Sequence, residues 1–391
     1  MKIHKLMPYS VIKYGKHLPM AVMANTRHGF PARKTKVIGV TGTDGKTTTV
    51  NMIYQILKEA GKKVSMISTI NAVIGGHEYD TGFHVTSPDP TMVQKFLYQA
   101  VKNGDEFMVL EVTSHALDQF RVWGIPFEIG VITNVTHDHL DYHKTFANYV
   151  KTKLKLVKSA KMAVINQNIE GSWDNKGKKV VTFGLNKGDF NQNQLKLKLK
   201  VPGDYNIENA LAALAVVLQL GIDLKSAKES LENFNGIEGR MEEVKNNKGI
   251  KIMVDFAHTP NALGNALITL RSQTKGNLIA VFGCASERDM EKRSLMGEIS
   301  GRLADITILT DEDPRFEDSN KIIEEIAKGV GDKKLFKEPD RKKAIELAIN
   351  MAKKGDVIGI FGKGHEKSMN YFGVEKPWSD TETVRKILKN E

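Results

Sequence analysis

The sequence is short of cysteine, of long apolar runs and, at its start, of acidic residues. A single cysteine, Cys284, among 391 residues excludes an internal disulfide. No stretch approaches the roughly 20 apolar residues that a membrane-spanning helix needs. These absences predict a globular protein in a reducing, cytoplasmic setting, and the length is sufficient for two or three domains.

Acidic residues are missing from the first 36 positions, which carry six Lys and two Arg. This segment therefore contributes +8 of the net charge of +11, and the rest of the chain is almost balanced at +3. Because the basic charge belongs to one short segment and not to the folded body, we expect no nucleic-acid partner.

Residues 1–35 form a short basic arm ahead of the first predicted strand. Its apolar residues recur at helical spacing: Ile3, Met7, Val11, Tyr14, Leu18 and Val22. Pro8 and Pro19 argue against one continuous helix, and the short apolar run at 18–24 argues against a cleaved signal peptide. Two interpretations stay open: a helix that packs on the body, or an amphipathic segment in peripheral contact with an anionic membrane.

From residue 36 onward, β-rich runs alternate with amphipathic helical patterns, which is typical of parallel sheets covered on both faces. The predicted strands are 36–40, 63–67, 107–112, 129–133 and 162–165, then 250–255, 278–282, 306–309 and 357–361. The predicted helices are 46–60, 91–103, 146–159 and 205–220, then 261–270, 292–304, 320–330 and 341–351. A hairpin or loop is expected at 186–200. The fold class is therefore α/β, with a central P-loop-type parallel-sheet domain over 36–236 and a smaller Rossmann-like domain over 237–391.

A glycine-rich turn between a predicted strand and a predicted helix is the sharpest local motif. It reads Gly42-Thr43-Asp44-Gly45-Lys46-Thr47-Thr48. Glycines let backbone N–H groups close around phosphate oxygens, and the helix N-terminus adds positive potential. Lys46 would neutralise the β- and γ-phosphates, and Thr47 would ligate Mg²⁺. The spacing departs from the full Walker pattern, because Val40 stands where its first glycine belongs.

Two polar groups follow later predicted strands. Glu111 ends the strand 107–112, where a carboxylate faces the ligand-binding crevice and suits a second Mg²⁺ ligand; a helix-capping role is the alternative. The segment 133–143 contains three His and two Asp. A zinc site is conceivable, but neither a His-x-x-x-His on a predicted helix nor a cysteine ligand accompanies this segment, so hard-metal and phosphate chemistry fits it better.

Together with later motifs, these patterns resemble the Mur ligase family. The matching motifs lie at 42–47, 86–90, 111–119, 133–143, 203–209, 239–242, 255–260, 281–293, 310–315 and 362–366. They extend over nearly all of the chain from Lys36 onward, and they are most similar to the branch that makes the muramyl tripeptide. The resemblance implies an ATP-dependent, ADP-forming ligase that adds a diamino acid to a muramyl-dipeptide-type acceptor through an acyl phosphate, in peptidoglycan precursor synthesis.

The resemblance also assigns residues position by position. Its catalytic set is Lys46, Glu111, His139 and Lys153. Two Mg²⁺ ions would be held by Thr47, Glu111, His139 and Lys153, the last as a carbamylated lysine. ATP would contact the loop 42–48 together with Asn206, Asn209, Arg240 and Asp255. The acceptor would contact Thr86, Ser87, Thr113 and Arg121, and the amino acid Arg288, Asp313, Arg315, Gly362 and Glu366. Without the family pattern, Lys153 would count as a solvated helix lysine.

The choice of amino acid depends on Glu312-Asp313-Pro314-Arg315. In the family, an Asp-Asn-Pro-Arg version goes with meso-diaminopimelate, whose distal carboxylate suits a guanidinium group. Arg315 is kept here, but the motif carries additional negative charge. We therefore favour meso-diaminopimelate and leave lysine open.

Members of the family normally carry an N-terminal domain that binds uridine diphosphate. Here only residues 1–35 precede the first predicted strand, so the resemblance does not extend to that part of the acceptor site. We expect recognition of the muramyl-peptide end alone, or a lipid-linked or polymer-linked acceptor.

Two other functions stay open. A related ligase would use a folate-like or polymeric acceptor, although the Asp-Pro-Arg and Gly-His-Glu motifs argue against it. A non-catalytic nucleotide-binding module would have little need for Glu111, His139 and Lys153 together. We favour the prediction of a monomeric ligase whose substrates are small molecules: ATP, an amino acid and a muramyl-peptide acceptor.

Overall fold

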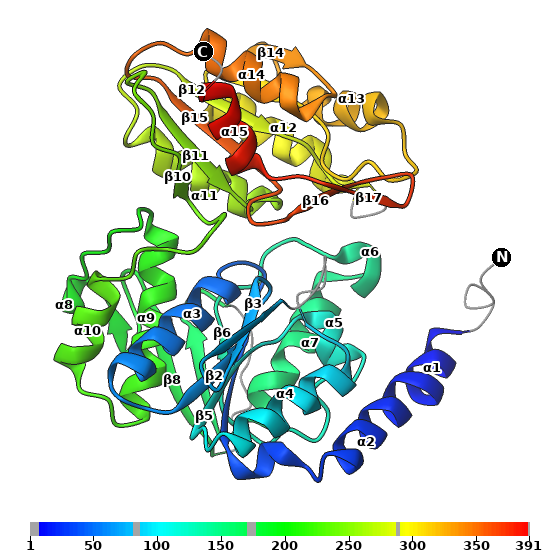
Figure 1. Ribbon diagram of the computed structural model, residues 1–391, viewed down its shortest axis with the longest axis vertical. Coiled ribbons are helices and arrows are strands. Elements are labelled where there is room, and N and C mark those ends of the chain that lie inside the picture. Colours follow the sequence, from blue (N-terminus) through cyan, green and yellow to red (C-terminus); the bar gives the residue numbers. More distant parts are fainter. Residues whose placement is uncertain (1–7, 81–86, 170–176, 287–289, 390–391) are drawn as a thin grey trace. The chain divides into compact units, whose positions relative to one another are not determined.

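A computed structural model describes residues 8–80, 87–169, 177–286 and 290–389. The chain divides into two compact units (Figure 1). The first comprises residues 1–135, 145–200 and 205–234, and the second comprises 136–144, 201–204 and 235–391. Two predicted substrate contacts, Thr86 and Arg288, lie outside the described residues.

The first unit is built on a nine-stranded sheet. Its strands are β1 (Lys36–Thr41), β2 (Val64–Ile67), β3 (Asn71–Ile74), β4 (His77–Asp80), β5 (Phe107–Glu111), β6 (Phe127–Ile132), β7 (Met162–Asn166), β8 (Lys179–Gly184) and β9 (Phe190–Asn191). The order is β4-β3-β2-β5-β1-β6-β7-β8-β9, parallel from β2 to β9 with β3 and β4 as an antiparallel hairpin. Central β1 is buried along almost its whole length, as expected of a parallel strand covered on both faces.

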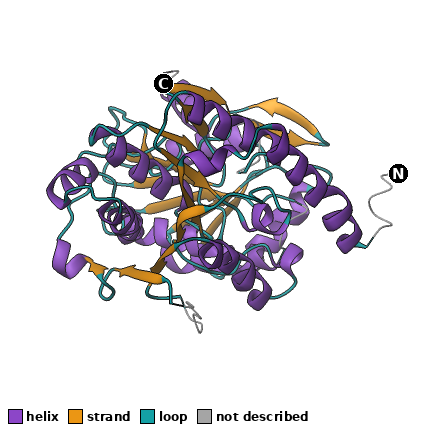
Figure 2. Ribbon diagram, turned by 90° about the horizontal axis from the view of Figure 1, so that it is seen from below, coloured by secondary structure: helices purple, strands orange, loops and turns teal. Residues whose placement is uncertain are grey.

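Seven helices of this unit follow the strands. They are α3 (Lys46–Glu59), α4 (Pro90–Lys102), α5 (Ser114–Asp118), α7 (Phe146–Ser159), α8 (Gln192–Leu195), α9 (Asp204–Gln219) and α10 (Leu224–Glu232). The region 186–200, expected to be a hairpin or loop, contains short β9 and the one-turn α8. Figure 2 distinguishes the helices, strands and loops of the chain by colour.

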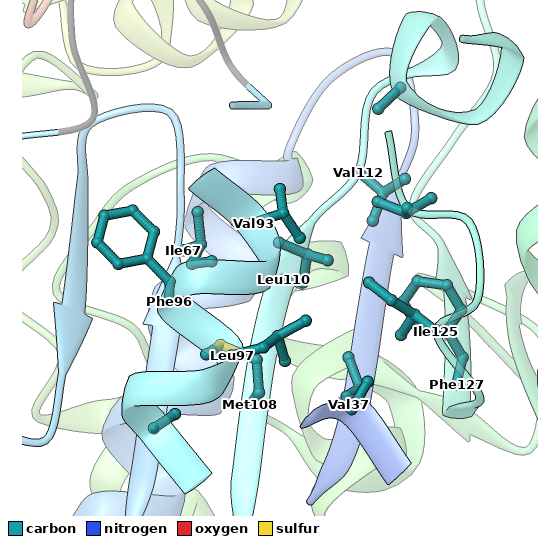
Figure 3. Close-up of a cluster of buried hydrophobic side chains, with 14 of the residues drawn as sticks. Val37, Ile67, Val93, Phe96, Leu97, Met108, Leu110, Val112, Ile125 and Phe127 are labelled. Carbon is teal, nitrogen blue, oxygen red and sulfur yellow. The ribbon is translucent and has the colours of Figure 1, made fainter. Parts of the chain in front are cut away.

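Helix α4 shows how the sequence builds the core of this unit. The Asp89 side chain accepts hydrogen bonds from the first backbone N–H groups, and Pro90 occupies the first turn, where no N–H is needed. Figure 3 shows the apolar face of α4 lying over the sheet, with Phe96 and Leu97 among the buried side chains. Truncating one such large side chain to alanine costs about 2–5 kcal/mol.

The N-terminal arm is a continuous helical run. It comprises α1 (Tyr9–Ile12), a π-helical turn (Lys13–His17) and α2 (Leu18–Arg27), followed by a 3₁₀ turn (Pro31–Lys34). The expectation that proline would interrupt the helix was wrong. Pro8 lies just before the first helical residue, and Pro19 follows the widened π turn, where its missing N–H and bulky ring are better tolerated. No helix in the described ranges is both long and apolar enough to cross a membrane.

The second unit has a smaller sheet. Its strands are β10 (Glu242–Glu243), β11 (Lys251–Asp255), β12 (Leu278–Phe282), β13 (Ile306–Leu309), β14 (Lys334–Lys337) and β15 (Val357–Phe361), in the order β10-β11-β15-β12-β13-β14. All pair in parallel except β10. A separate hairpin consists of β16 (Ser368–Tyr371) and β17 (Val374–Pro377). The predicted α/β class, with a large parallel sheet and a smaller C-terminal sheet, is confirmed.

Six helices belong to the second unit. They are α6 (Leu140–His143), α11 (Pro260–Arg271), α12 (Glu291–Leu303), α13 (Ser319–Val330), α14 (Arg341–Met351) and α15 (Asp380–Lys389). Ile345 and Ile349 of α14 pack into one cluster with Ile279 and Ile358 of the sheet and Val384 of α15. This cluster fixes the sheet ends from which the polar loops of the unit emerge.

Candidate active site

The glycine-rich turn joins the carboxyl end of β1 to the start of α3. Gly45 precedes the helix with φ +81°, and a Cβ at this position would collide with Asn209 Oδ1. Only glycine tolerates both the positive φ and the close approach of Asn209. The turn is held from β6 by Asn134, whose Oδ1 accepts from the Asp44 N–H at 2.9 Å, and by Thr133, which donates to the Asp44 carbonyl at 2.6 Å.

Two lysine ammonium groups converge on this turn. Lys46 Nζ donates to the carbonyls of Gly42 at 3.2 Å and Thr43 at 2.7 Å. Lys153 of α7 is 1% exposed, and its Nζ donates to the same Gly42 carbonyl at 2.6 Å. The Lys153 Nζ also lies 4.3 Å from the ring centroid of Tyr149. Lys153 is therefore not a solvated helix lysine, and the turn concentrates positive charge where an anion would bind.

Glu111, at the end of β5, is 1% exposed and is surrounded by neutral donors. Its Oε2 accepts from Thr47 Oγ1 at 3.0 Å and from the Thr69 N–H at 2.8 Å, and its Oε1 accepts from Thr69 Oγ1 at 2.8 Å. A buried carboxylate next to hydroxyl groups is a donor set of hard oxygens, which suits Mg²⁺. Within the described residues no cluster of three His, Cys, Asp or Glu side chains could hold a metal by itself.

Three residues assigned to the acceptor lie next to Glu111. Ser87 Oγ lies 3.3 Å from the Glu111 carbonyl and 3.2 Å from Thr113 Oγ1, and it accepts from the Thr113 N–H at 3.1 Å. Arg121 Nη1 donates to the Ser87 carbonyl at 2.7 Å. The structure thus brings Ser87, Thr113 and Arg121 together.

Asn206 and Asn209, assigned to ATP, are buried on α9. Asn209 Nδ2 donates to Asn206 Oδ1 at 3.4 Å, and Thr49 Oγ1 donates to Asn209 Oδ1 at 3.4 Å. Since Asn209 also lies against Gly45, this amide reaches the glycine-rich turn itself.

His139 belongs to the second unit, on the segment 136–144. It has the left-handed φ of +54°, and its Nε2 lies 3.3 Å from Asp138 Oδ2. Burial raises the pKa of Asp138, but the positive charges of His139, Lys292 and His258 outweigh it and hold the pKa far below its usual range. Asp138 is therefore an anion at neutral pH.

Asp255 ends β11 and organises the turn that carries Arg240. Its Oδ2 accepts from the Met241 N–H at 2.7 Å and its Oδ1 from the Ala257 N–H at 2.8 Å. Met241 has φ +50°. The Arg240 guanidinium lies 4.3 Å from the Phe256 ring centroid, and the Phe256 and His365 ring centroids are 5.0 Å apart.

The residues assigned to the amino acid surround a buried lysine, Lys363. Its Nζ donates to Asp313 Oδ1 at 2.9 Å and lies 2.5 Å from Glu366 Oε2. Arg315 is tied to β16 through its backbone, since its N–H donates to the Asn370 carbonyl at 3.0 Å. Asp313 and Arg315 both have positive φ, +47° and +49°. The structure thus brings Asp313, Glu366 and Lys363 together.

Beneath these loops lie Gly362 and Glu312. Gly362 has φ +106°, and a Cβ there would collide with Glu312 Oε2. Glu312 is fully buried, and burial is the main cause that raises its pKa to about 7.

An arginine clamp supports both loops. Arg341, at the start of α14, is 1% exposed and forms two hydrogen bonds with the Asp380 carboxylate at 2.8 and 2.7 Å. The same guanidinium donates to the Asp311 carbonyl at 3.1 Å and to the Phe361 carbonyl at 2.8 Å. These carbonyls directly precede the loops of Asp313 and Gly362.

Comparisons with known proteins match this arrangement. Residues 40–217 match the model of the Mur ligase middle domain, and residues 239–364 match that of the Mur ligase glutamate ligase domain. The UDP-N-acetylmuramoyl-L-alanyl-D-glutamate--2,6-diaminopimelate ligase of Clostridium tetani is 39% identical over 399 residues, which cover 95% of this chain and 81% of the relative. The enzyme of the same name from Aquifex aeolicus is 40% identical and matches over 92% of this chain and 79% of its own. A solved structure of a ligase of that name superposes with a TM-score of 0.60 at 28% identity, over 94% of this chain and 82% of that one.

The chain belongs to the Mur ligase family. It is accordingly an ATP-dependent, ADP-forming ligase that joins an acid to an amino acid. For a Mur ligase, Lys46 at the glycine-rich turn and the hydroxyl-lined carboxylate of Glu111 make chemical sense, because a bound triphosphate needs positive charge and hard oxygen ligands.

Sequence reasoning missed several residues of this Mur ligase site. Thr69, Tyr149 and Lys363 were not singled out, although each contacts a residue that was. Arg341, which holds the backbone before two of the predicted loops, was missed as well. Lys363 carried a signal, because it lies within the 362–366 motif. Thr69 and Arg341 carried none, since each contacts partners that are distant in sequence. Tyr149 carried none either, because it lies one turn before Lys153 on α7 as an ordinary helix residue.

Proposed function

We propose that this Mur ligase joins an amino group of meso-diaminopimelate to the terminal carboxylate of a UDP-muramyl dipeptide, at the expense of ATP. The observation that carries the proposal is the convergence of Lys46 and Lys153 on one carbonyl of the glycine-rich turn, in the same unit as the Thr47–Glu111 contact. The names of relatives that align with this chain over 79–81% of their length supply the substrates.

The chemistry needs activation, because a carboxylate does not react with an amine at neutral pH. The acceptor carboxylate attacks the γ-phosphorus of ATP, and the bond from that phosphorus to the bridging oxygen of ADP breaks. The amine then attacks the acyl phosphate, loses a proton and expels inorganic phosphate. Lys46 and the backbone N–H groups of residues 42–48 hold the transferring phosphoryl group and offset the charge that accumulates between the two anions.

Mg²⁺ fits the residues present. Thr47 and Glu111 would hold it, and the ion would supply neutralisation of the phosphate charge and alignment of the reacting oxygens. We further propose a carbamate on Lys153 as a ligand of a second ion. The support for the carbamate is the burial of Lys153 and the position of its amine at the phosphate-binding turn.

The amino-acid loops favour diaminopimelate over lysine. The case for lysine depended on the extra negative charge at Glu312 and Asp313. Asp313 is ion-paired with Lys363, and burial raises the pKa of Glu312 to about 7, which weakens its negative charge. The guanidinium of Arg315 is the group of opposite charge that we propose for the distal carboxylate of diaminopimelate.

The acceptor is proposed to contact Ser87, Thr113 and Arg121, whose side chains and backbone form one hydrogen-bonded cluster beside Glu111. Hydroxyl groups and a guanidinium suit the carbonyls and carboxylates of a short peptide.

The test is the release of phosphate from ATP in the presence of UDP-muramyl dipeptide and one amino acid at a time, with product masses measured. We expect turnover with meso-diaminopimelate, little with lysine, and a product heavier by one diaminopimelate residue. Arg315→Lys is the matched variant, because it keeps the charge but loses the two-pronged geometry. Phosphate release that ignores both the amino acid and the dipeptide would contradict the proposal.

A further inference from the structure

The arm helix contacts the first unit through one side only. Tyr9 donates to Asp118 Oδ2 at 2.6 Å, and Lys13 Nζ lies 2.5 Å from Asp118 Oδ1. Farther along, Ala24 and Asn25 are buried, and Asn25 Nδ2 donates to the Trp123 carbonyl at 2.8 Å. These contacts fix which face of the helix is turned towards the body.

Several apolar side chains of the arm remain exposed. Val11 is 50% exposed, Tyr14 60% and Met23 68%. Val11 and Tyr14 belong to the stripe that the sequence placed at helical spacing, and of these two Tyr14 has a ring contact with the body, so packing on the body accounts for that stripe only in part. Exposed apolar residues in such a row on a short helix indicate an unfilled interaction surface.

The charge of this surface is positive. Lys16 and Arg27 are exposed on the arm, and residues 8–36 contain no acid. The neighbouring Asp118 does not oppose this charge, because Lys13 and Lys155 lie 2.5 and 3.5 Å from its Oδ1. The partner that fits is therefore both apolar and anionic.

A cavity of about 200 Å³ adjoins the arm, lined mainly by apolar side chains. Its lining residues include Leu117, Phe120, Val122, Trp123, Ile125 and Phe127. Two of them touch the arm: Phe120 packs against Tyr14 with ring centroids 5.8 Å apart, and Trp123 accepts the hydrogen bond from Asn25. The cavity thus lies beside the arm, next to Tyr14 and Asn25.

We propose that the exposed face of the arm and this cavity form a docking surface for an anionic lipid bilayer. Val11, Tyr14 and Met23 enter the interfacial region, Lys16 and Arg27 meet the lipid phosphates, and an acyl chain reaches the cavity beside Trp123. Basic amphipathic helices bind membranes by this combination of apolar burial and attraction to anionic lipid. The inference is independent of the ligase reaction.

The test is binding of the full chain to vesicles of phosphatidylcholine with about one third phosphatidylglycerol, compared with phosphatidylcholine alone. We expect binding to the anionic vesicles only. Lys16→Gln/Arg27→Gln should weaken it about 25-fold, at about fivefold per charge. Val11→Ser/Met23→Ser should weaken it about tenfold or more through lost apolar burial. Lys245→Gln/Lys333→Gln, which removes two exposed charges from the second unit, should leave it unchanged.

Tryptophan fluorescence tests separately whether an acyl chain reaches the cavity. Lipids with brominated acyl chains should quench part of the tryptophan fluorescence, and that part should vanish in Trp123→Phe. Ligase activity and thermal unfolding without vesicles show that each variant is folded.

Three outcomes would overturn the proposal: no binding to anionic vesicles, equal loss in the second-unit control, or binding that ignores Val11→Ser/Met23→Ser. A dimer that forms without lipid, and that the same substitutions abolish, would assign the surface to a second copy of the chain instead.

Discussion

The buried ion pair of Arg341 and Asp380, the clamp described above, should contribute a large part of the stability of the second unit. The two side chains are 1% and 0% exposed, and Arg341→Met would remove four hydrogen bonds while leaving the Asp380 carboxylate buried with Trp378 Nε1 as a donor at 2.8 Å. Removing one partner of such a buried pair costs about 3–5 kcal/mol. A typical domain is stable by only about 5–15 kcal/mol, so the loss should be readily measured.

Trp378 provides the assay, because its indole donates directly to Asp380. In a Trp123→Phe/Trp173→Phe background it is the only tryptophan in the chain, and its fluorescence during urea unfolding reports on the second unit. Arg271→Met is the matched control: Arg271 lies 2.8 Å from Asp305, but the two side chains are 38% and 35% exposed, so the loss should stay below about 1 kcal/mol. Arg341→Met/Asp380→Asn, which removes both charges, should recover part of the loss.

The clamp also has a kinetic consequence. Since Arg341 holds the carbonyls of Asp311 and Phe361, its loss should raise the KM for the amino acid more than the KM for ATP. Equal stability losses in Arg341→Met and Arg271→Met, or a parallel rise of both KM values, would refute the reasoning.

Three further results are expected. Lys46→Ala should abolish phosphate release, whereas Lys58→Ala, later on the same helix, should not, because Lys46 and not Lys58 contacts the phosphate-binding turn. Comparable activity in the two variants would contradict the role of Lys46. Lys153→Ala should be nearly inactive and partly restored by added small carboxylates, and full activity without rescue would argue against the carbamate. Burial raises the pKa of Glu312 from 4.5 to about 7, so its stabilising effect is present below pH 4.5 and is lost as the pH rises through 7. Glutamine cannot ionise, so the unfolding free energy of Glu312→Gln relative to the parent should increase by roughly 3 kcal/mol between pH 4.5 and 7. A difference that does not change with pH would show that the carboxyl is already ionised.

The fold was largely predictable because its buried strands and amphipathic helices have strong periodicity. Central β1 and β12 are continuous apolar runs, and both were predicted within a residue or so. The hairpins β3–β4 and β16–β17 were missed, as was edge strand β14. Half-exposed edge strands such as β17 carry no apolar run, and their pairing depends on neighbours that the local sequence does not specify.

The site was predictable only where a motif marks it. Glycines, Lys46 and Glu111 occur at spacings that chemistry restricts, whereas Thr69 and Arg341 act through contacts that only the folded chain creates. The arm shows the same limit. Helical spacing identified its apolar stripe, but it could not show that Asp118 pairs with Tyr9 and Lys13 or that Val11 stays exposed.

The left-handed backbone at four motif residues has a consequence for engineering. His139, Met241, Asp313 and Arg315 are among the nine non-glycine residues with positive φ in the described ranges. Each such conformation costs about 1–3 kcal/mol that glycine would avoid. A selection for heat resistance alone should therefore enrich glycine at these four positions and return sturdier proteins with impaired ligation, so thermostabilised versions are better sought with these codons held fixed.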